Sequence, residues 1–450
     1  MWPAAVLVEA RTPALRHSAG MARCRANWSE PDAAAALACL ILDEEKGNPH
    51  RQHPLPRPLY SDSIASFLHF DDPVPNQLYV IGGRNRDHGP LDTVEMFDTW
   101  NGCWVQCPSM SARRAGCAAA VLRDQRILCM GGYDVNGIVQ GLLATCEAFD
   151  PIQEAWDASV ADMERARWGH GCAAMDGLVY VVGGCSLQPG APPEETFMET
   201  LRSCEVYDPG ANTWRPTADL QFARAGSRVV AIGTKYLAAV GGCDDVFGRA
   251  QTLSSVELFD ITACRWTLLD VHLTTPRTTA AVASVEGRGI LVIGGAPSLS
   301  TSEVCRLRVP ADTGEVGGEQ TSALAEPEAT GALPALHVGD ISEGRMGCQA
   351  AVLQLPAPGA NYPLCSRTCV VVVGGENGEE ELEQADVRQF DSVLVYDAEE
   401  CVWLPGEVVP PMLAPRTAMA VCVGCGYVRG YPSRGRKDAS EPVVTSRGGS

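Results

Sequence analysis

Two short stretches decide the fold: RWGHGCAAMDGLVYVVGG at residues 167–184 and CEVYDPGANTW at residues 204–214. The first contains an Arg, a segment of small residues, a continuous apolar run and two glycines. The second alternates in polarity, ends in Tyr-Asp, and has a Trp six residues after the Asp. The same order of features returns along most of the chain, so one structural unit is repeated.

Six glycine pairs, each preceded by four apolar residues, mark the copies at spacings of 49, 52, 58, 53 and 80 residues. The pairs are Gly82-Gly83, Gly131-Gly132, Gly183-Gly184, Gly241-Gly242, Gly294-Gly295 and Gly374-Gly375. Five copies also carry the Trp: Trp104, Trp156, Trp214, Trp266 and Trp403. An Arg before small residues opens five copies and recurs after the last: Arg114, Arg167, Arg224, Arg277, Arg345 and Arg416.

Each unit is interpreted as four short strands. The first is rich in Ala and Gly, which suits close approach at a common axis. The second is continuously apolar and therefore buried on both faces. The glycine pair permits positive φ where the chain leaves this strand, the third strand alternates, and the fourth carries the Trp. Radial stacking of such four-stranded units predicts an all-β propeller.

The Gly-Gly pairs, the aromatic-Asp and the spaced Trp resemble the kelch repeat over roughly residues 75–425. This resemblance implies a six-bladed kelch β-propeller with four antiparallel strands per blade. The strand after Arg416 is expected to pair with the first blade and close the ring, which removes a free sheet edge. An alternative inner strand for blade one is 61–70.

Two segments depart from the repeat and carry much of the formal charge of −20. Blade five lacks Asp and Trp after Gly295 and is followed by 309–344, which holds seven acids and no Lys or Arg. After the sixth pair, 376–391 has a net charge of −6. Both segments are expected as loops on one face, where they form an acidic sector; the alternative is that they only maintain solubility.

The six repeat arginines are the first candidate binding residues. They are expected to ring the channel mouth, with Tyr133 after the second glycine pair and His170 on an inner strand as further partner-binding candidates. Guanidinium groups bind carboxylate or phosphate through forked donors. The alternative is that each Arg pairs with an acid of its own blade and holds the blades together.

Composition excludes several other classes of function. The acidic charge opposes nucleic-acid binding, and the longest early apolar run, 33–42, is too short to span a bilayer. Nineteen cysteines, an odd number with many in apolar runs, favour a reducing intracellular compartment, most simply the cytoplasm, over a disulfide scaffold. Of eight histidines only His170 falls on an inner strand, so we expect no metal and no cofactor.

The sequence therefore predicts a non-enzymatic, monomeric module that binds a protein or peptide through the face bearing the arginines and the loops after the glycine pairs. Scaffolding and ubiquitin-ligase substrate recognition are roles that the resemblance leaves open. The alternative is a propeller enzyme acting on a small polar ligand in the channel mouth. Residues 1–60 are expected as an irregular extension with a short helix, 61–426 as the propeller, and 427–450 as a disordered tail. The Arg-rich residues 1–28 also resemble a transit peptide.

Overall fold

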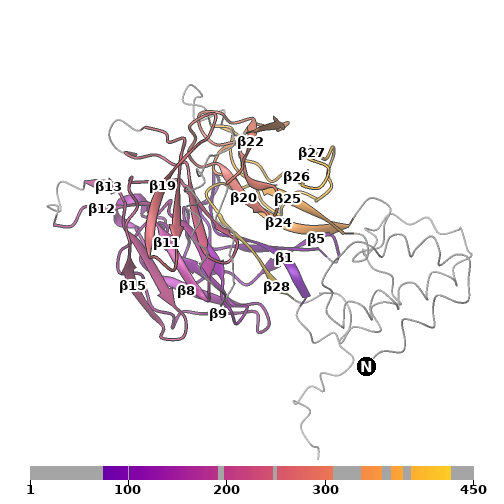
Figure 1. Ribbon diagram of the computed structural model, residues 1–450. Helices are drawn as coiled ribbons and strands as arrows, with labels where there is room; N and C mark the ends of the chain where they lie inside the picture. Colours follow the sequence, from indigo (N-terminus) through magenta and orange to yellow (C-terminus); the bar gives the residue numbers. More distant parts are fainter. Residues whose placement is uncertain are drawn as a thin grey trace, which may run out of the picture. The chain divides into compact units, whose positions relative to one another are not determined.

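The computed structural model describes residues 74–99, 101–190, 197–246, 251–307, 336–356, 366–378 and 387–426. These residues form six small antiparallel sheets of four strands each, arranged in a ring (Figure 1). Among the described residues, the one α-helix is a single turn, α4 (Gly137–Gln140). The predicted six-bladed β-propeller is therefore confirmed.

Within each blade the strands follow one another from the channel outward. Blade 1 consists of β28 (Ala420–Gly426), β1 (Val74–Ile81), β4 (Val94–Asp98) and β5 (Cys103–Cys107). Blade 2 consists of β6 (Ala118–Val121), β7 (Ile127–Met130), β8 (Cys146–Asp150) and β9 (Ala155–Asp157). Blade 3 consists of β10 (Gly171–Met175), β11 (Leu178–Val182), β14 (Cys204–Asp208) and β15 (Thr213–Thr217).

The second half of the ring repeats this order. Blade 4 consists of β16 (Arg228–Ile232), β17 (Tyr236–Val240), β18 (Ser255–Asp260) and β19 (Arg265–His272). Blade 5 consists of β20 (Ala281–Val285), β21 (Gly289–Ile293), β22 (Thr301–Cys305) and β23 (Leu336–Asp340). Blade 6 consists of β24 (Gln349–Pro356), β25 (Ser366–Val373), β26 (Val393–Asp397) and β27 (Val402–Trp403).

Two small hairpins extend the loops that follow glycine pairs. They are β2 (Arg84–Asn85) with β3 (Gly89–Pro90), and β12 (Cys185–Leu187) with β13 (Met198–Thr200). We call the end of the propeller where the glycine pairs and these loops lie the mouth face.

The C-terminal strand closes the ring, as predicted. β28 pairs antiparallel with β1, with Ala420 opposite Ile81 and Val423 opposite Leu78. It therefore occupies the inner position of blade 1. From the sequence alone, 61–70 is an alternative strand for this position. Residues 61–70, the extension 1–60 and the tail 427–450 lie outside the described residues.

The glycine pairs are required by close backbone approach. Gly82 and Gly83 have φ of 59° and 89°. A Cβ on Gly82 would lie 2.6 Å from the Arg114 carbonyl oxygen, and one on Gly83 would lie 2.7 Å from that of Thr417. Only glycine adopts this conformation at this distance without strain. The pair thus allows close backbone contact both with the segment that enters the next blade and with the segment that enters the inner strand of its own blade.

The apolar core lies between adjacent blades. One cluster contains Leu128 of blade 2 beside Val181 of blade 3, and another contains Val80 of blade 1 beside Val371 of blade 6. The repeated Trp residues join neighbouring blades as well. Trp104, Trp156, Trp214 and Trp266 each donate the indole N–H to a carbonyl of the preceding blade or its outgoing loop, at 2.7–3.1 Å.

The described residues that flank the acidic insertion of blade 5 do not lie where the sequence predicted them. They end β22 and begin β23, the third and fourth strands, so both flanks lie at the end opposite the mouth face. The expected single acidic face is therefore wrong. Residues 336–340, predicted as loop, are strand β23, and 308–335 lie outside the described residues. No helix in the described ranges is long and apolar enough to cross a membrane.

Candidate partner-binding site

The six repeat arginines are buried inside the blades. Each has a relative exposure of 2% or less. Arg224 illustrates the arrangement: Nη1 donates to the carbonyl oxygens of Gly241 at 2.8 Å and Ser255 at 3.0 Å, and Nε donates to Glu257 Oε1 at 3.0 Å. Its own carbonyl accepts the Gly184 N–H from the preceding blade at 2.7 Å. The residue thus joins its own blade to its neighbour.

Five of the six arginines share this geometry with a Glu on the third strand of the same blade. The Arg and Glu partners are Arg114–Glu147, Arg167–Glu205, Arg224–Glu257, Arg277–Glu303 and Arg416–Glu95. Each Glu also accepts a backbone N–H from the loop that precedes the Arg, as Glu257 does from Gln221 at 2.7 Å. A buried ion pair stabilises only when such additional hydrogen bonds satisfy it.

These contacts correct the placement of the predicted arginine ring. The six guanidinium groups do not line an exposed channel mouth, because their donors are directed to carbonyl and carboxylate oxygens of the propeller itself. The alternative interpretation, in which each Arg holds blades together, describes five of them. The acid on which it depends is present in the sequence as the second residue of the CEVYD-like segment in blades 1 to 5.

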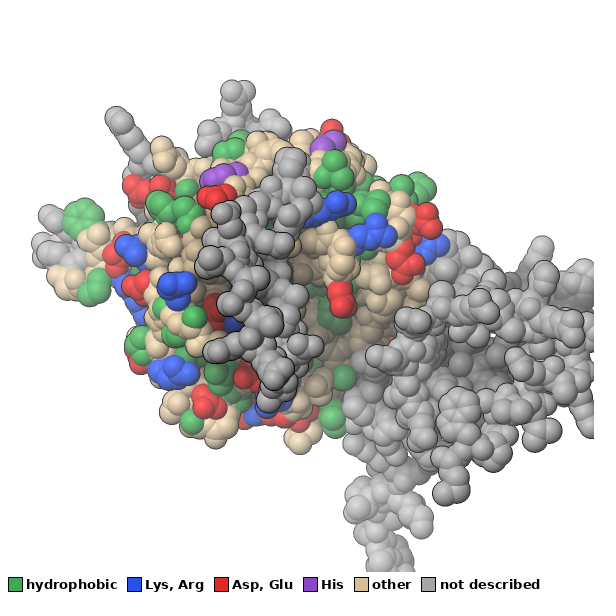
Figure 2. Space-filling model, in the orientation of Figure 1, with side chains coloured by type: hydrophobic (Ala, Val, Ile, Leu, Met, Phe, Trp, Pro, Cys, Tyr) green, Lys and Arg blue, Asp and Glu red, His purple; other side chains and the backbone are tan. Residues whose placement is uncertain are grey.

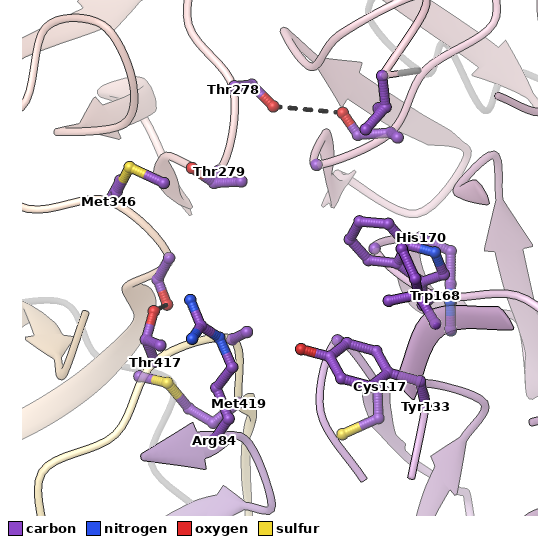
Figure 3. A pocket seen from close by; sticks show the side chains of 18 of the residues that line it. Arg84, Cys117, Tyr133, Trp168, His170, Thr278, Thr279, Met346, Thr417 and Met419 are labelled. Carbon is purple, nitrogen blue, oxygen red and sulfur yellow. Dashed lines mark hydrogen bonds between the residues drawn. The ribbon is translucent and has the colours of Figure 1, made fainter. Parts of the chain in front are cut away.

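The mouth face instead contains a central cavity of about 400 Å³. All six blades or their adjoining loops line it. In Figure 3, Tyr133, Trp168 and His170 lie across from Arg84 and Met419. The walls are largely apolar: Tyr133, Ile138, Trp168, Val246, Met346 and Met419 all contribute. Such a concave apolar site with few polar groups is typical of a binding pocket.

Two aromatic residues from neighbouring blades form one wall of this cavity. Tyr133 follows the glycine pair of blade 2, and Trp168 follows the repeat Arg of blade 3. Their rings meet edge to face, with centroids 6.0 Å apart and planes at 84°. Tyr133, a predicted site residue, therefore lies at the cavity. Trp168 was not predicted.

His170, the other predicted residue outside the arginine set, lines the same cavity with 1% exposure. Burial, together with the positive charges of Arg167 and Arg228, lowers its pKa from 6.5 to about 3. The imidazole is therefore neutral at physiological pH. Neither ring nitrogen has a hydrogen-bond partner among the described residues.

At the rim, Arg84 is the more exposed of the two cationic residues that line the cavity. Its side chain is 41% exposed and donates Nη2 to Glu376 Oε1 at 2.8 Å. Glu376 also accepts Gln389 Nε2 at 3.2 Å. This pair joins the loops of blades 1 and 6 and leaves little net charge at the rim.

The surface outside the cavity carries no single-sign field in the view drawn. Figure 2 shows acidic, basic and hydrophobic side chains interspersed over the visible atoms of described residues. A nucleic-acid surface would need clustered Lys and Arg. Among the described residues, no group of three or more His, Cys, Asp or Glu is arranged to hold a metal ion.

Comparison with known proteins agrees with the repeat and the ring of blades. A family model described as the KLHDC2/KLHL20/DRC7 Kelch-repeats domain matches residues 69–295, half of the chain. The chain belongs to the kelch-repeat family.

Several kelch proteins resemble it at moderate identity. Human Kelch-like protein 34 is 29% identical over 255 residues, which cover 53% of this chain and 35% of that protein. Kelch-like protein 25 of Xenopus tropicalis is 27% identical over 280 residues, covering 62% and 39%. Beta-scruin of Limulus polyphemus is 27% identical over 243 residues, covering 52% and 25%. The chain thus matches well under half the length of each relative.

Proposed function

We propose that this kelch propeller binds a protein partner at the mouth face, with partner side chains inserted into the central cavity. The observation that carries the proposal is the cavity itself, about 400 Å³ with an apolar wall and buried polar atoms that have no partner in the described part of the propeller. Aromatic side chains in such a setting dominate interface energetics, because they bury a large area at low entropic cost.

The distribution of exposed apolar side chains supports the same face. Eight large hydrophobic residues are exposed in the described chain. Five lie in loops that emerge at the mouth face: Val135, Phe197, Phe222, Val408 and Leu413. The other three lie at the opposite end: Ile152, Leu336 and Val402. Exposed apolar residues around an apolar cavity are typical of a protein-binding surface.

The free thiols support a reducing compartment for this binding. All sixteen cysteines in the described ranges are unpaired, and most are buried among apolar residues. Secreted proteins of comparable cysteine content rely on disulfides. We propose that the propeller acts inside the cell as a binding module without catalytic activity.

The enzymatic alternative depends on His170. A general base is most effective when its pKa lies near the working pH, whereas burial and neighbouring arginines hold the pKa of His170 at about 3. This side chain is a weak base at neutral pH, and the binding role is the better supported of the two.

The test compares partner capture by matched variants of the full chain. Tagged wild-type protein, a Tyr133→Ala/Trp168→Ala variant and an Ile152→Ala/Val402→Ala control are incubated with the same cell extract, and recovered proteins are quantified by mass spectrometry. We expect at least one protein to be retained by wild type and by the control, and to fall roughly tenfold or more with the cavity variant. Circular dichroism verifies that all three are folded.

Equal recovery of every retained protein by wild type and the cavity variant would overturn the proposal. Loss confined to the control would instead place the binding surface at the opposite end of the propeller.

A further inference from the structure

Arg228 differs from the six repeat arginines in its surroundings. It opens the inner strand β16 of blade 4 and lines the central cavity. Nε donates to the Ala280 carbonyl of blade 5 at 3.2 Å, and Nη2 is 3.4 Å from the Cys348 carbonyl at the start of blade 6. The side chain thus reaches from its own blade toward two others, across the inner end of the cavity.

Arg228 has no carboxylate partner among the described residues. Burial lowers the pKa of Arg228, and the neighbouring Cys348 and Cys172 oppose this shift. Five of the repeat arginines are paired with a buried Glu, whereas the acid among the described residues that line the cavity, Glu376, is bound to Arg84. Arg228 is partly buried, and a partly buried cation without a counter-charge favours the binding of an anion.

Three further side chains of the cavity present polar atoms that nothing in the described chain satisfies. The indole N–H of Trp168, the hydroxyl of Thr279 and both ring nitrogens of His170 are buried without a hydrogen-bond partner. In Figure 3, Trp168 and His170 face the cavity from one side, with Thr279 on another. Buried polar groups are nearly always paired, so this group of polar atoms around one cavity is suited to bind a polar group of a ligand.

We propose that the inner part of the cavity binds a carboxylate carried by an acidic side chain of the partner. Arg228 supplies the charge, the Trp168 N–H and the Thr279 hydroxyl are the neutral donors, and Met346 covers the apolar stem. This inference rests on the proposed function and assigns the chemistry of the inserted group. A carboxylate fits better than a phosphate, because a phosphate presents three strongly accepting oxygens and about two charges to one guanidinium and few donors.

The test uses small probes with the full chain, so that no partner has to be known. Phenylacetate combines a carboxylate with an apolar body, and phenylacetamide is its neutral counterpart. Binding is followed by ligand-observed NMR and by tryptophan fluorescence, for wild type, Arg228→Gln and Arg123→Gln. Arg123 is a matched control, because its side chain is 73% exposed and pairs with Asp176 away from the cavity.

We expect phenylacetate to bind wild type and Arg123→Gln equally, and to bind Arg228→Gln roughly tenfold or more weakly, as for loss of a charge-assisted hydrogen bond. Phenylacetamide should bind wild type weakly and be indifferent to Arg228→Gln. If Arg228→Gln does not fold, Trp168→Phe and Thr279→Val replace it. Each removes one neutral donor. Thr279→Val does so with little change of shape, whereas Trp168→Phe also shortens the apolar wall, so we expect both variants to weaken phenylacetate more than phenylacetamide.

Equal affinity for phenylacetate and phenylacetamide would overturn the proposal, as would tighter binding of phenyl phosphate than of phenylacetate. Retention of phenylacetate by folded Arg228→Gln would do the same. These outcomes leave the proposed function intact if the Tyr133→Ala/Trp168→Ala variant still loses its captured partner, so the two failures are distinguishable.

Discussion

The seam between blades 3 and 4 and the seam between blades 5 and 6 are built from one repeat but are stabilised differently. At the first, the Trp266 indole donates to the Ala218 carbonyl at 3.1 Å. Arg224 is held there by the buried Glu257, and the Gly184 N–H donates to the Arg224 carbonyl. All three signature contacts are present.

At the seam between blades 5 and 6 only the backbone contact is retained. The Gly295 N–H donates to the Arg345 carbonyl at 2.9 Å, but the indole N–H of Trp403 is buried without a partner in the described chain. The third strand of blade 6 has Leu394 where the other blades have Glu. Arg345 pairs instead with Glu343, which is 33% exposed.

This difference teaches that the backbone contacts of the glycine pairs are sufficient to build a seam, whereas the side-chain contacts determine how strongly it is held. Arg345 keeps part of its stabilisation by other means, since its guanidinium lies 4.4 Å from the Phe390 ring centroid. The seam between blades 5 and 6 is therefore the place where we expect local opening to begin.

The largest effect is expected from removing the acid at each seam. Glu257→Ala leaves Arg224 as an uncompensated buried charge, and should lower the free energy of unfolding by about 3–5 kcal/mol. Glu343→Ala should lower it by less, because this carboxylate is partly exposed and Arg345 keeps its contacts with the carbonyl oxygens of Gly374 and Ser392 and with the Phe390 ring. Urea denaturation followed by circular dichroism measures both. Equal losses would contradict the comparison.

A smaller effect is expected from the indole N–H. Trp266→Phe and Trp403→Phe remove similar apolar area, but only Trp266 loses a hydrogen bond. Trp266→Phe should therefore be more destabilising than Trp403→Phe by about 1–2 kcal/mol. Thermal unfolding of the two variants gives this difference directly. A larger loss for Trp403→Phe would mean that its N–H has a partner in solution.

The smallest effect concerns the turn between the third and fourth strands. Asp260 accepts the backbone N–H groups of Thr262 at 2.8 Å and Ala263 at 2.9 Å, and blade 5 has the exposed Arg306 at this place. Asp260→Ala should destabilise by about 1 kcal/mol, and Arg306→Ala by less than about 0.5 kcal/mol. Chemical denaturation at neutral pH compares them, and a larger loss for Arg306→Ala would contradict the expected order.

The pH dependence of the Asp260 variant sharpens this test. The hydrogen bond from Ala263 is the main cause of the lowered pKa of Asp260. A lowered pKa contributes stability that is present above the ordinary Asp pKa and is lost as the pH falls through the folded-state value. The difference between wild type and Asp260→Ala should therefore be constant from about pH 7 to pH 5 and shrink below about pH 4. A difference that persists at low pH would show that the carboxylate charge is irrelevant.

Much of the fold is predictable because each blade corresponds to one copy of a repeated sequence pattern. The glycine pairs, the aromatic-Asp and the Trp recur at fixed spacing, and the orphan Arg416 indicates the strand that closes the ring. Insertions are less predictable. The sequence predicts loop throughout 309–344, whereas Leu336–Asp340 forms the fourth strand of blade 5, because its exposed, mixed composition gives no alternating signal.

The candidate site is less predictable, for a physical reason. Residues that recur along the repeat, such as Arg224, bind other recurring residues, such as Glu257. Their charged groups are therefore paired inside the propeller and do not contact a ligand. Cavity residues differ from blade to blade: Trp168, His170 and Arg228 stand one, three and four positions after a repeat Arg. Variation between blades at these positions, rather than the shared Arg, is the feature of the sequence that indicates the candidate binding site.

The most direct test of the central claim, that the cavity at the mouth face receives the partner, is a site-specific photo-crosslink. A benzophenone amino acid is placed in turn at Tyr133, on the cavity wall, and at Ile152, at the opposite end of the propeller. After capture from extract and irradiation, adducts are resolved by electrophoresis and mass spectrometry. We predict a partner adduct from position 133 and none from position 152. An adduct from position 152 alone, or equal yields from both, would contradict the assignment.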